Sequence, residues 1–213
     1  MIRRRIALLG TAAVLATPFL PRPAAAASVW STGWRLPADL RFIDGNGRTI
    51  GMDVLGRGIA IIRVGGLWCP PCVSERSDTD TFADAHPRVP LFLAVAAQPG
   101  GTIEQAFQAE IADFRRRGRD LSRVMRRDPS SARIPPPPTV PHTLVLRDGL
   151  ALESLSGIGS YQSRRGLFDA APTWRSYVEA VLICVAPDSL EQAAVLPQSR
   201  AIAQRRAPDA CRA

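Results

Sequence analysis

The feature that most limits the fold is an apolar strand that leads directly into a pair of cysteines. Residues 58–64 read GIAIIRV, a β-branched run of strand length, and they end at two glycines. Cys69 and Cys72 follow, separated by two prolines, where a helix can begin. A cysteine at a helix N-terminus is stabilised as a thiolate by the helix dipole and free N–H groups. The junction therefore predicts a reactive Cys69 exposed at the edge of a sheet, with a more buried Cys72 that resolves mixed disulfides.

The remaining pattern alternates strands with helices. This alternation predicts an α/β fold with parallel strands, and a final antiparallel hairpin makes the central sheet mixed. Residues 119–138 are basic and then proline-rich, and we interpret them as a loop with one helical turn. A short helix is expected to begin near Asp188 or Ser189. The other expected elements are a hairpin at 40–52, strands at 58–64, 90–98, 139–146 and 150–157, and helices at 73–86, 102–118 and 171–186.

The N-terminal segment has the pattern of an export signal. Three arginines, Arg3 to Arg5, precede an apolar run at residues 6–20, and small residues before Ala27 suit cleavage. An uncleaved membrane anchor is the alternative. We therefore divide the chain into a signal peptide (1–27), a domain (28–186) and a C-terminal extension (187–213). The net charge of +8 falls to +4 without the four arginines of the signal, which gives little reason to expect a nucleic-acid partner.

The four cysteines are consistent with export, because disulfides persist in oxidising compartments. The natural pairs are Cys69 with Cys72 and Cys184 with Cys211. We expect the second pair to be a structural disulfide that fixes the C-terminal tail to the last helix. A buried free thiol at Cys184 and an intermolecular bridge are the alternatives.

A metal site is the competing interpretation of a Cys-x-x-Cys pair, since such pairs form half of many zinc sites. The remaining ligand candidates do not form a second close pair; they are His86, His142, Cys184 and Cys211. We therefore expect neither a metal nor another cofactor.

Three stretches together resemble a known family. They are WCPPCVSE after a strand, TVPHTLVLRDG about seventy residues later, and the lead-in RFIDGNGRTIGMDVLGRGIAIIRV. Over residues 38–186 they resemble the TlpA/DsbE-like branch of exported thioredoxins. Members usually carry Phe-Trp where this chain has Val64-Gly65, and Arg63 is unusual at the end of a core strand. The resemblance implies a thioredoxin-like fold and a thiol–disulfide oxidoreductase.

The resemblance also assigns roles to individual residues. Cys69 matches the attacking, solvent-facing thiol and Cys72 the resolving thiol. Trp68 matches the residue that flanks the nucleophile, and Pro141 matches a cis-proline that faces the disulfide. Glu75 matches an acidic residue which, if held partly out of water, has a raised pKa and can exchange the proton of the resolving thiol.

Simpler interpretations remain open for these residues. Glu75 could be a solvated residue in the first helical turn, Pro141 an ordinary trans-proline, and Trp68 a core aromatic rather than a docking surface. Val140 and His142 flank the proline and are expected to contact substrate. His142 could instead be a polar residue on a half-exposed strand end.

The resemblance implies protein thiol or disulfide substrates in the periplasm, apocytochrome c among them, and a membrane-bound electron donor. We expect a monomer. Pro70 and Pro71 have no N–H to offer a thiolate, which favours a moderately reducing protein. The alternatives are a copper-chaperone or other non-catalytic binding module on the same fold, and an interaction protein with an inert, stapled loop.

Overall fold

The computed structural model describes residues 29–131, 133–157 and 173–205. The expected signal peptide lies outside them. Within these three stretches, every helix is too short or too polar to cross a membrane.

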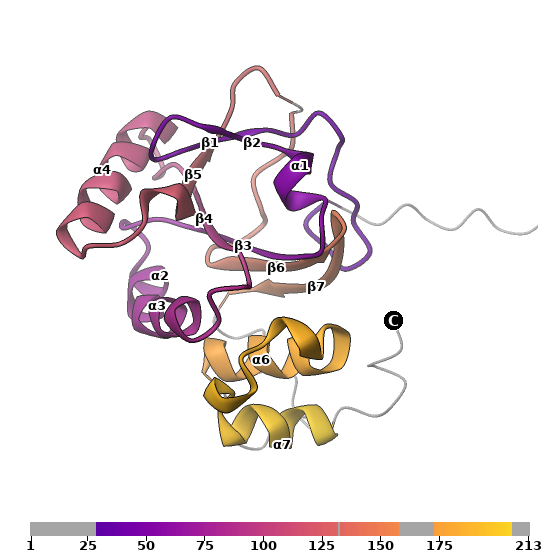
Figure 1. Cartoon of the computed structure of the whole chain (residues 1–213). Helices are drawn as coiled ribbons and strands as arrows, with labels where there is room; N and C mark the ends of the chain where they lie inside the picture. Colours follow the sequence, from indigo (N-terminus) through magenta and orange to yellow (C-terminus); the bar gives the residue numbers. More distant parts are fainter. Residues whose placement is uncertain (1–28, 132, 158–172, 206–213) are drawn as a thin grey trace, which may run out of the picture.

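A seven-stranded sheet forms the centre of the domain, in the order β2-β1-β5-β4-β3-β6-β7 (Figure 1). Strand β3 pairs in parallel with β4 and antiparallel with β6, and β6 and β7 form the final hairpin. The sheet is therefore mixed, and the predicted α/β class is confirmed. The strands are β1 (Phe42–Asp44), β2 (Thr49–Ile50), β3 (Ile59–Gly65), β4 (Leu91–Val95), β5 (Val124–Arg127), β6 (His142–Arg147) and β7 (Leu150–Ser156).

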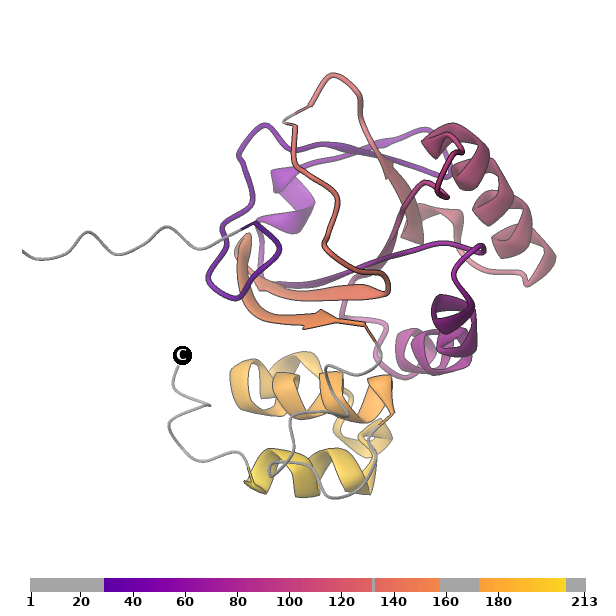
Figure 2. The ribbon, with the colours of Figure 1, turned by 180° about the vertical axis from the view of Figure 1, so that it is seen from behind.

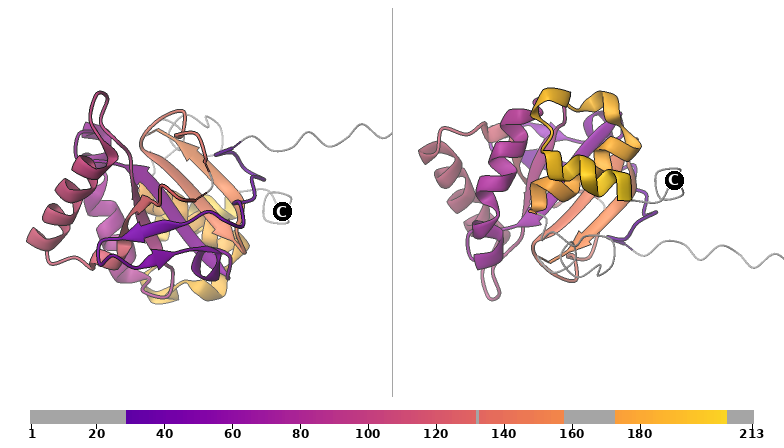
Figure 3. Two further views of the ribbon diagram at one scale, coloured as in Figure 1. Left: turned by 90° about the horizontal axis from the view of Figure 1, so that it is seen from above. Right: turned by 90° about the horizontal axis from the view of Figure 1, so that it is seen from below.

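The longer helices cover one face of the sheet. Seen from below, α3, α6 and α7 lie over the strands, with α4 beside α3 (Figure 3). Phe82 of α3 and Trp174 of α6 pack with Ile61 of β3, while Phe107 of α4 packs with Val95 of β4. The helices are α1 (Met52–Leu55), α2 (Pro70–Ser74), α3 (Arg76–Ala85), α4 (Ile103–Arg116), α6 (Trp174–Val185) and α7 (Pro197–Arg205), with 3-10 turns η1 (Leu121–Arg123), η2 (Pro187–Ser189) and η3 (Gln192–Ala194).

The opposite face is covered by irregular chain rather than by long helices. The segment from Trp30 to Leu40, helix α1 and parts of the proline-rich loop pack on Ile62, Val64 and Leu144. Trp30 holds this cover together, because its indole N–H donates to the Pro135 carbonyl at 2.7 Å. The two faces therefore meet different partners, and β3 is buried on both, as a central strand of this kind requires.

Strand β5 corrects the sequence analysis, which placed residues 119–138 in a loop. Val124 and Met125 are fully buried in the sheet between β1 and β4, whereas Arg126 and Arg127 are partly exposed. A strand this short has only two apolar residues, and the surrounding arginines conceal its pattern. The strand forms because its backbone groups complete the ladders of both neighbours.

The predicted helix 73–86 is two helices. It begins earlier, at Pro70, because proline is tolerated in the first helical turn, where no N–H partner is required. It is broken at Glu75, which ends α2 and precedes α3.

The C-terminal helix begins at Pro197, after two 3-10 turns, rather than near Asp188. Figure 2 shows α7 packed beneath α6, on the side away from the sheet. Its attachment is polar as well as apolar: the Glu179 carboxylate of α6 accepts hydrogen bonds from Ser199 Oγ at 2.6 Å and the Leu196 N–H at 2.9 Å. The described part of the extension is thus joined to the domain.

Candidate active site

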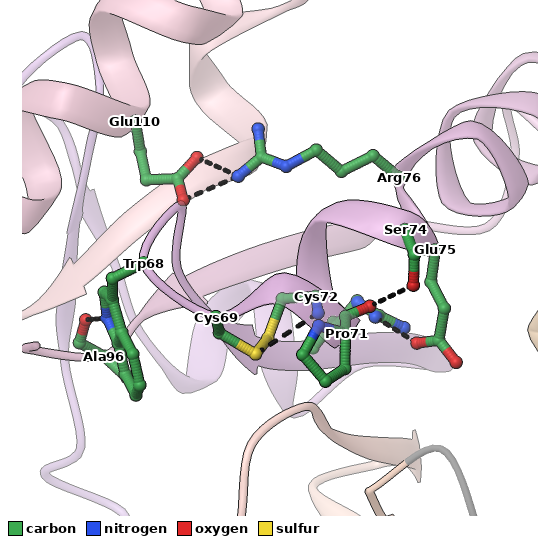
Figure 4. Close-up of a disulfide and its surroundings, with 10 residues drawn as sticks. Trp68, Cys69, Pro71, Cys72, Ser74, Glu75, Arg76, Ala96 and Glu110 are labelled. Atoms are coloured by element: carbon green, nitrogen blue, oxygen red, sulfur yellow. Dashed lines mark hydrogen bonds and ion pairs between the residues drawn. A yellow bond between two sulfur atoms is a disulfide. The ribbon is translucent and has the colours of Figure 1, made fainter.

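The two cysteines form a disulfide where β3 ends and α2 begins (Figure 4). Cys69 is the N-cap of α2, and its sulfur accepts a hydrogen bond from the Cys72 N–H at 3.2 Å. Pro70 and Pro71 occupy the first two helical positions and have no N–H. Neither proline can therefore donate to the Cys69 sulfur, and the N–H of Cys72 remains as its donor.

Both cysteines are buried in this oxidised form, with exposed fractions of 3% for Cys69 and 4% for Cys72. The expectation that Cys69 faces solvent while Cys72 is more buried is therefore wrong for the disulfide. The chain turns back before α2, since the Cys69 N–H donates to the Gly66 carbonyl at 3.1 Å, and this turn folds Cys69 against its own chain. A substrate must approach a nearly enclosed sulfur.

Two glycines at the end of β3 make room for the site. A Cβ atom on Gly65 would lie 2.9 Å from Cys72 Sγ, and one on Gly66 would lie 2.6 Å from Trp68 Nε1. Both distances are too short for atoms that are not hydrogen-bonded. Gly65 and Gly66 are therefore required for the close approach of the cysteine helix and the tryptophan ring.

Trp68 lies beside the disulfide and is half-buried. Its indole N–H donates to the Ala96 carbonyl at 3.0 Å, which ties the ring to the end of β4. The ring borders a hollow of about 160 Å³ that Gln105, Ala106 and Ala109 of α4 also line. The Trp68 ring is thus held in place by a hydrogen bond and lines one side of the hollow, and it is not a freely exposed ring.

The Val140–Pro141 peptide bond is cis, as the resemblance implied. Because His142 pairs with Val64 across the β3–β6 ladder, Pro141 lies level with Gly65, the residue that packs against Cys72. The proline is buried and Val140 is half-buried. The register therefore brings Pro141 to the disulfide although the two are far apart in the sequence.

His142 is neither a substrate contact nor a residue on a half-exposed strand end, the two roles considered from the sequence. Its side chain is 1% exposed, and its ring contacts the Trp30 carbonyl and the Ser154 and Ser156 hydroxyls at 3.0–3.2 Å. Burial lowers its pKa below the ordinary value, so the neutral ring is favoured. The side chain is enclosed between Trp30 and β7, and it is not available to a substrate.

Glu75 is buried and forms an ion pair with Arg63 of β3. Burial raises the pKa of Glu75 above its ordinary value, and the Arg63 charge opposes that rise. The Arg63 guanidinium also lies over the Trp174 ring, 5.4 Å from its centre. Of the two interpretations, burial excludes the solvated residue.

Arg63 stood out in the sequence as unusual, but its ion pair with Glu75 and a second ion pair were not predicted. Arg76, the residue after Glu75, donates to both carboxylate oxygens of Glu110 at 2.7 Å (Figure 4). A lone arginine inside an apolar strand was the one available signal for Arg63. Glu110 had a comparable signal, because it lies next to Ile111 on the apolar side of its helix.

A metal site and a second disulfide were also considered from the sequence. Across the described stretches, His, Cys, Asp and Glu residues form no cluster of three or more that could hold a metal ion. Cys184 is half-buried near the end of α6, but Cys211 lies outside the described residues. The Cys184–Cys211 disulfide therefore stays a prediction.

The architecture around the disulfide decides the fold. A strand enters the cysteine helix, a parallel neighbour follows, and an antiparallel pair begins at the cis-proline. The fold is thioredoxin-like. This agrees with the fold that the resemblance implied.

Comparisons with known proteins give structural neighbours only. No family model and no curated protein matches the sequence. The exposed lipoprotein thioredoxin of Streptococcus pneumoniae is 18% identical, with 56% of this chain and 90% of that chain covered and a TM-score of 0.41. StoA of Bacillus subtilis is 19% identical, with 58% of this chain and 91% of that chain covered and a TM-score of 0.41. A thio-disulfide isomerase of Thermus thermophilus is 17% identical, with 59% of this chain and 86% of that chain covered and a TM-score of 0.41.

Proposed function

We propose that the protein is a thiol–disulfide oxidoreductase that exchanges its Cys69–Cys72 disulfide with protein substrates. The observation that carries the proposal is the position of this pair at the strand–helix junction, with Cys69 as the helix N-cap. A sulfur in that position is stabilised as a thiolate, which is the reactive form of cysteine.

In the reducing direction, the Cys69 thiolate attacks one sulfur of a substrate disulfide. The substrate S–S bond breaks, its second sulfur leaves as a thiolate, and a mixed disulfide with Cys69 forms. Cys72 then loses its proton and attacks the Cys69 sulfur, which releases the first substrate sulfur. Two electrons pass from the Cys69–Cys72 pair to the substrate, and the same steps in reverse oxidise a substrate dithiol.

Glu75 is proposed as the group that takes the Cys72 proton. It lies one helical turn beyond Cys72, and its raised pKa suits a carboxyl that both accepts and returns protons. The ion pair with Arg63 of β3 fixes the position of this carboxyl. Trp68, Val140 and Pro141 are proposed to border the approaching substrate.

The cellular setting follows from the sequence. The signal-like N-terminus supports export to the periplasm, and the resemblance to the TlpA/DsbE-like branch supports envelope substrates, including apocytochrome c, and a membrane-bound electron donor. The Cys69 sulfur accepts a hydrogen bond from the Cys72 N–H, while the two prolines offer none, so we propose a moderately reducing protein. We also propose that the protein acts as a monomer.

Insulin reduction by the mature protein tests the activity. We expect turnover with dithiothreitol that Cys69→Ser abolishes, while the matched variant Cys184→Ser retains it. Equal activity of Cys69→Ser and wild type would refute the proposal. Inactive protein that binds one equivalent of copper would support the copper-chaperone alternative instead.

A further inference from the structure

Arg63 lies inside an otherwise apolar strand, and the two terminal nitrogens of its guanidinium differ in their contacts. Nη2 forms the ion pair with Glu75. Nη1 is buried and has no hydrogen-bond partner among the residues that the structure describes. A buried donor without an acceptor lowers stability, and nearly all buried polar groups in folded proteins have a partner. The Nη1 group therefore needs an explanation that the Glu75 contact does not give.

The side chain of Arg63 lies on the face of β3 that meets the cysteine helix. Residues two apart in a strand point to the same face, so Arg63 and Gly65 share one. A Cβ atom on Gly65 would lie 2.9 Å from Cys72 Sγ. Arg63 and Cys72 also line the same cavity of about 220 Å³, whose other walls come from α3, β4 and the end of α4. The Arg63 charge is thus held near the sulfur of the resolving thiol.

The other charged residues that line this cavity find opposite charges on α3, α4 or η1. Figure 4 shows the Arg76 side chain extending toward Glu110 on α4. Both terminal nitrogens of Arg76 contact carboxylates of α4, whereas Arg63 keeps Nη1 for a further acceptor. The neighbouring charges are Arg76 with Glu110 and Asp113, Arg117 with Asp80, Arg119 with Asp84, and Asp120 and Arg123 at the two ends of η1.

We propose that Nη1 of Arg63 stabilises the negative charge that forms on Cys72 when this residue resolves the mixed disulfide. The inference rests on the proposed function, because it concerns the same step. Cys72 Sγ gives its proton to a carboxylate oxygen of Glu75, so the negative charge moves from Glu75 to the sulfur. Arg63 serves both ends of this transfer, and neither end becomes an unpaired buried charge. The thiolate then attacks Cys69 Sγ, the mixed S–S bond breaks, and the substrate sulfur leaves with the electron pair.

The redox state of the pair explains why Nη1 has no partner in this structure. In the disulfide, the Cys72 sulfur is neutral and a weak acceptor, whereas a thiolate carries a full charge. The guanidinium stays charged, since arginine does not lose its proton in proteins. An opposite charge close to an acidic group lowers its pKa by about 1–3 units. Arg63 should therefore lower the pKa of the Cys72 thiol in the reduced protein.

Variants that lack the Glu75 charge isolate the effect of Arg63. The pKa of Cys72 is measured in reduced Cys69→Ser protein, from the chemical shift of its Cβ carbon after isotope labelling of cysteine. Glu75→Gln is compared with Glu75→Gln combined with Arg63→Met, which leaves no unpaired charge at either position. Glu75→Gln combined with Arg63→Lys provides a second charged reference if Glu75→Gln alone does not fold. Arg119→Met in the Glu75→Gln background is the matched control, because it removes a positive charge from the same cavity at a side chain that is 31% exposed.

We expect Arg63→Met to raise the pKa of Cys72 by about one unit or more, and Arg119→Met to cause less than half of that shift. An unchanged Cys72 pKa would mean that Arg63 acts only by fixing Glu75, and would overturn the proposal. An equal shift in Arg119→Met would assign the effect to the general charge of the cavity and overturn it as well. The titration uses no substrate, so loss of insulin reduction alone would count against the proposed function and not against this inference.

Discussion

Pro71 offers the sharpest test of how the site controls the Cys69 thiolate. An N-cap side chain accepts from the N–H of the second or third helical residue, and here the second is Pro71, which has none. Pro71→Ala therefore supplies a second donor beside the existing Cys72 N–H. Because Cys69 is buried, water provides little substitute for that donor in the wild type.

The magnitude follows from one added hydrogen bond to a charged acceptor. Such bonds contribute about 1.5–3 kcal/mol, and sulfur is a weak acceptor, so the lower end applies. A stabilisation of about 1.4 kcal/mol lowers the pKa of Cys69 by roughly one unit. The same energy raises the two-electron reduction potential by roughly 30 mV at a pH where the thiolate predominates.

The assay is the equilibrium of the protein with a series of glutathione buffers, read by the fraction of reduced Cys69–Cys72. Pro70→Ala is the matched control, since the N–H of the first helical residue does not face the N-cap side chain. We expect a shift for Pro71→Ala and none for Pro70→Ala. Equal shifts in the two variants, or no shift in either, would refute the reasoning.

Three further predictions concern buried groups near the site. Arg63→Met should lower the free energy of unfolding by about 3–5 kcal/mol in urea because it removes the ion-pair partner of the buried Glu75 carboxylate. Arg63→Met combined with Glu75→Met should recover most of the loss, and an additive double variant would contradict this prediction. Burial lowers the pKa of His142, so its neutral ring stabilises the fold above the ordinary histidine pKa of about 6.5, and this stabilisation is lost as the pH falls through the lower folded pKa. His142→Gln should therefore make the urea midpoint less dependent on pH between 7.5 and 5. An unchanged pH dependence would refute this prediction. Gly65→Ala should destabilise the oxidised protein by about 1–3 kcal/mol because the added Cβ would lie 2.9 Å from Cys72 Sγ. A variant as stable in urea as wild type would refute this prediction, because it would show that the cysteine helix shifts at little cost.

Much of the fold was accessible from the sequence because its strongest signals are local. Strand β3 is apolar except for Arg63, and Thr102 caps α4 in a capping box with Gln105. The cysteine pair follows β3 directly. Such elements could be placed without knowledge of their neighbours.

The missed features depend on contacts between distant parts of the chain. Strand β5 is short and basic, and only its place between two strands makes it a strand. The Arg63–Glu75 and Arg76–Glu110 pairs join separate elements, so no spacing in the sequence indicates them. The burial of His142 likewise follows from the Trp30 segment, which has no regular pattern of its own.

The central claim is that Cys69 is the nucleophile of a disulfide exchange. The most direct measurement incubates reduced Cys72→Ser protein with a disulfide-containing peptide and locates the adduct by mass spectrometry. We predict a mixed disulfide at Cys69, which is stable because the resolving thiol is gone. Absence of that adduct, or equally fast adduct formation at Cys72 in Cys69→Ser protein, would show that Cys69 is not the dedicated nucleophile.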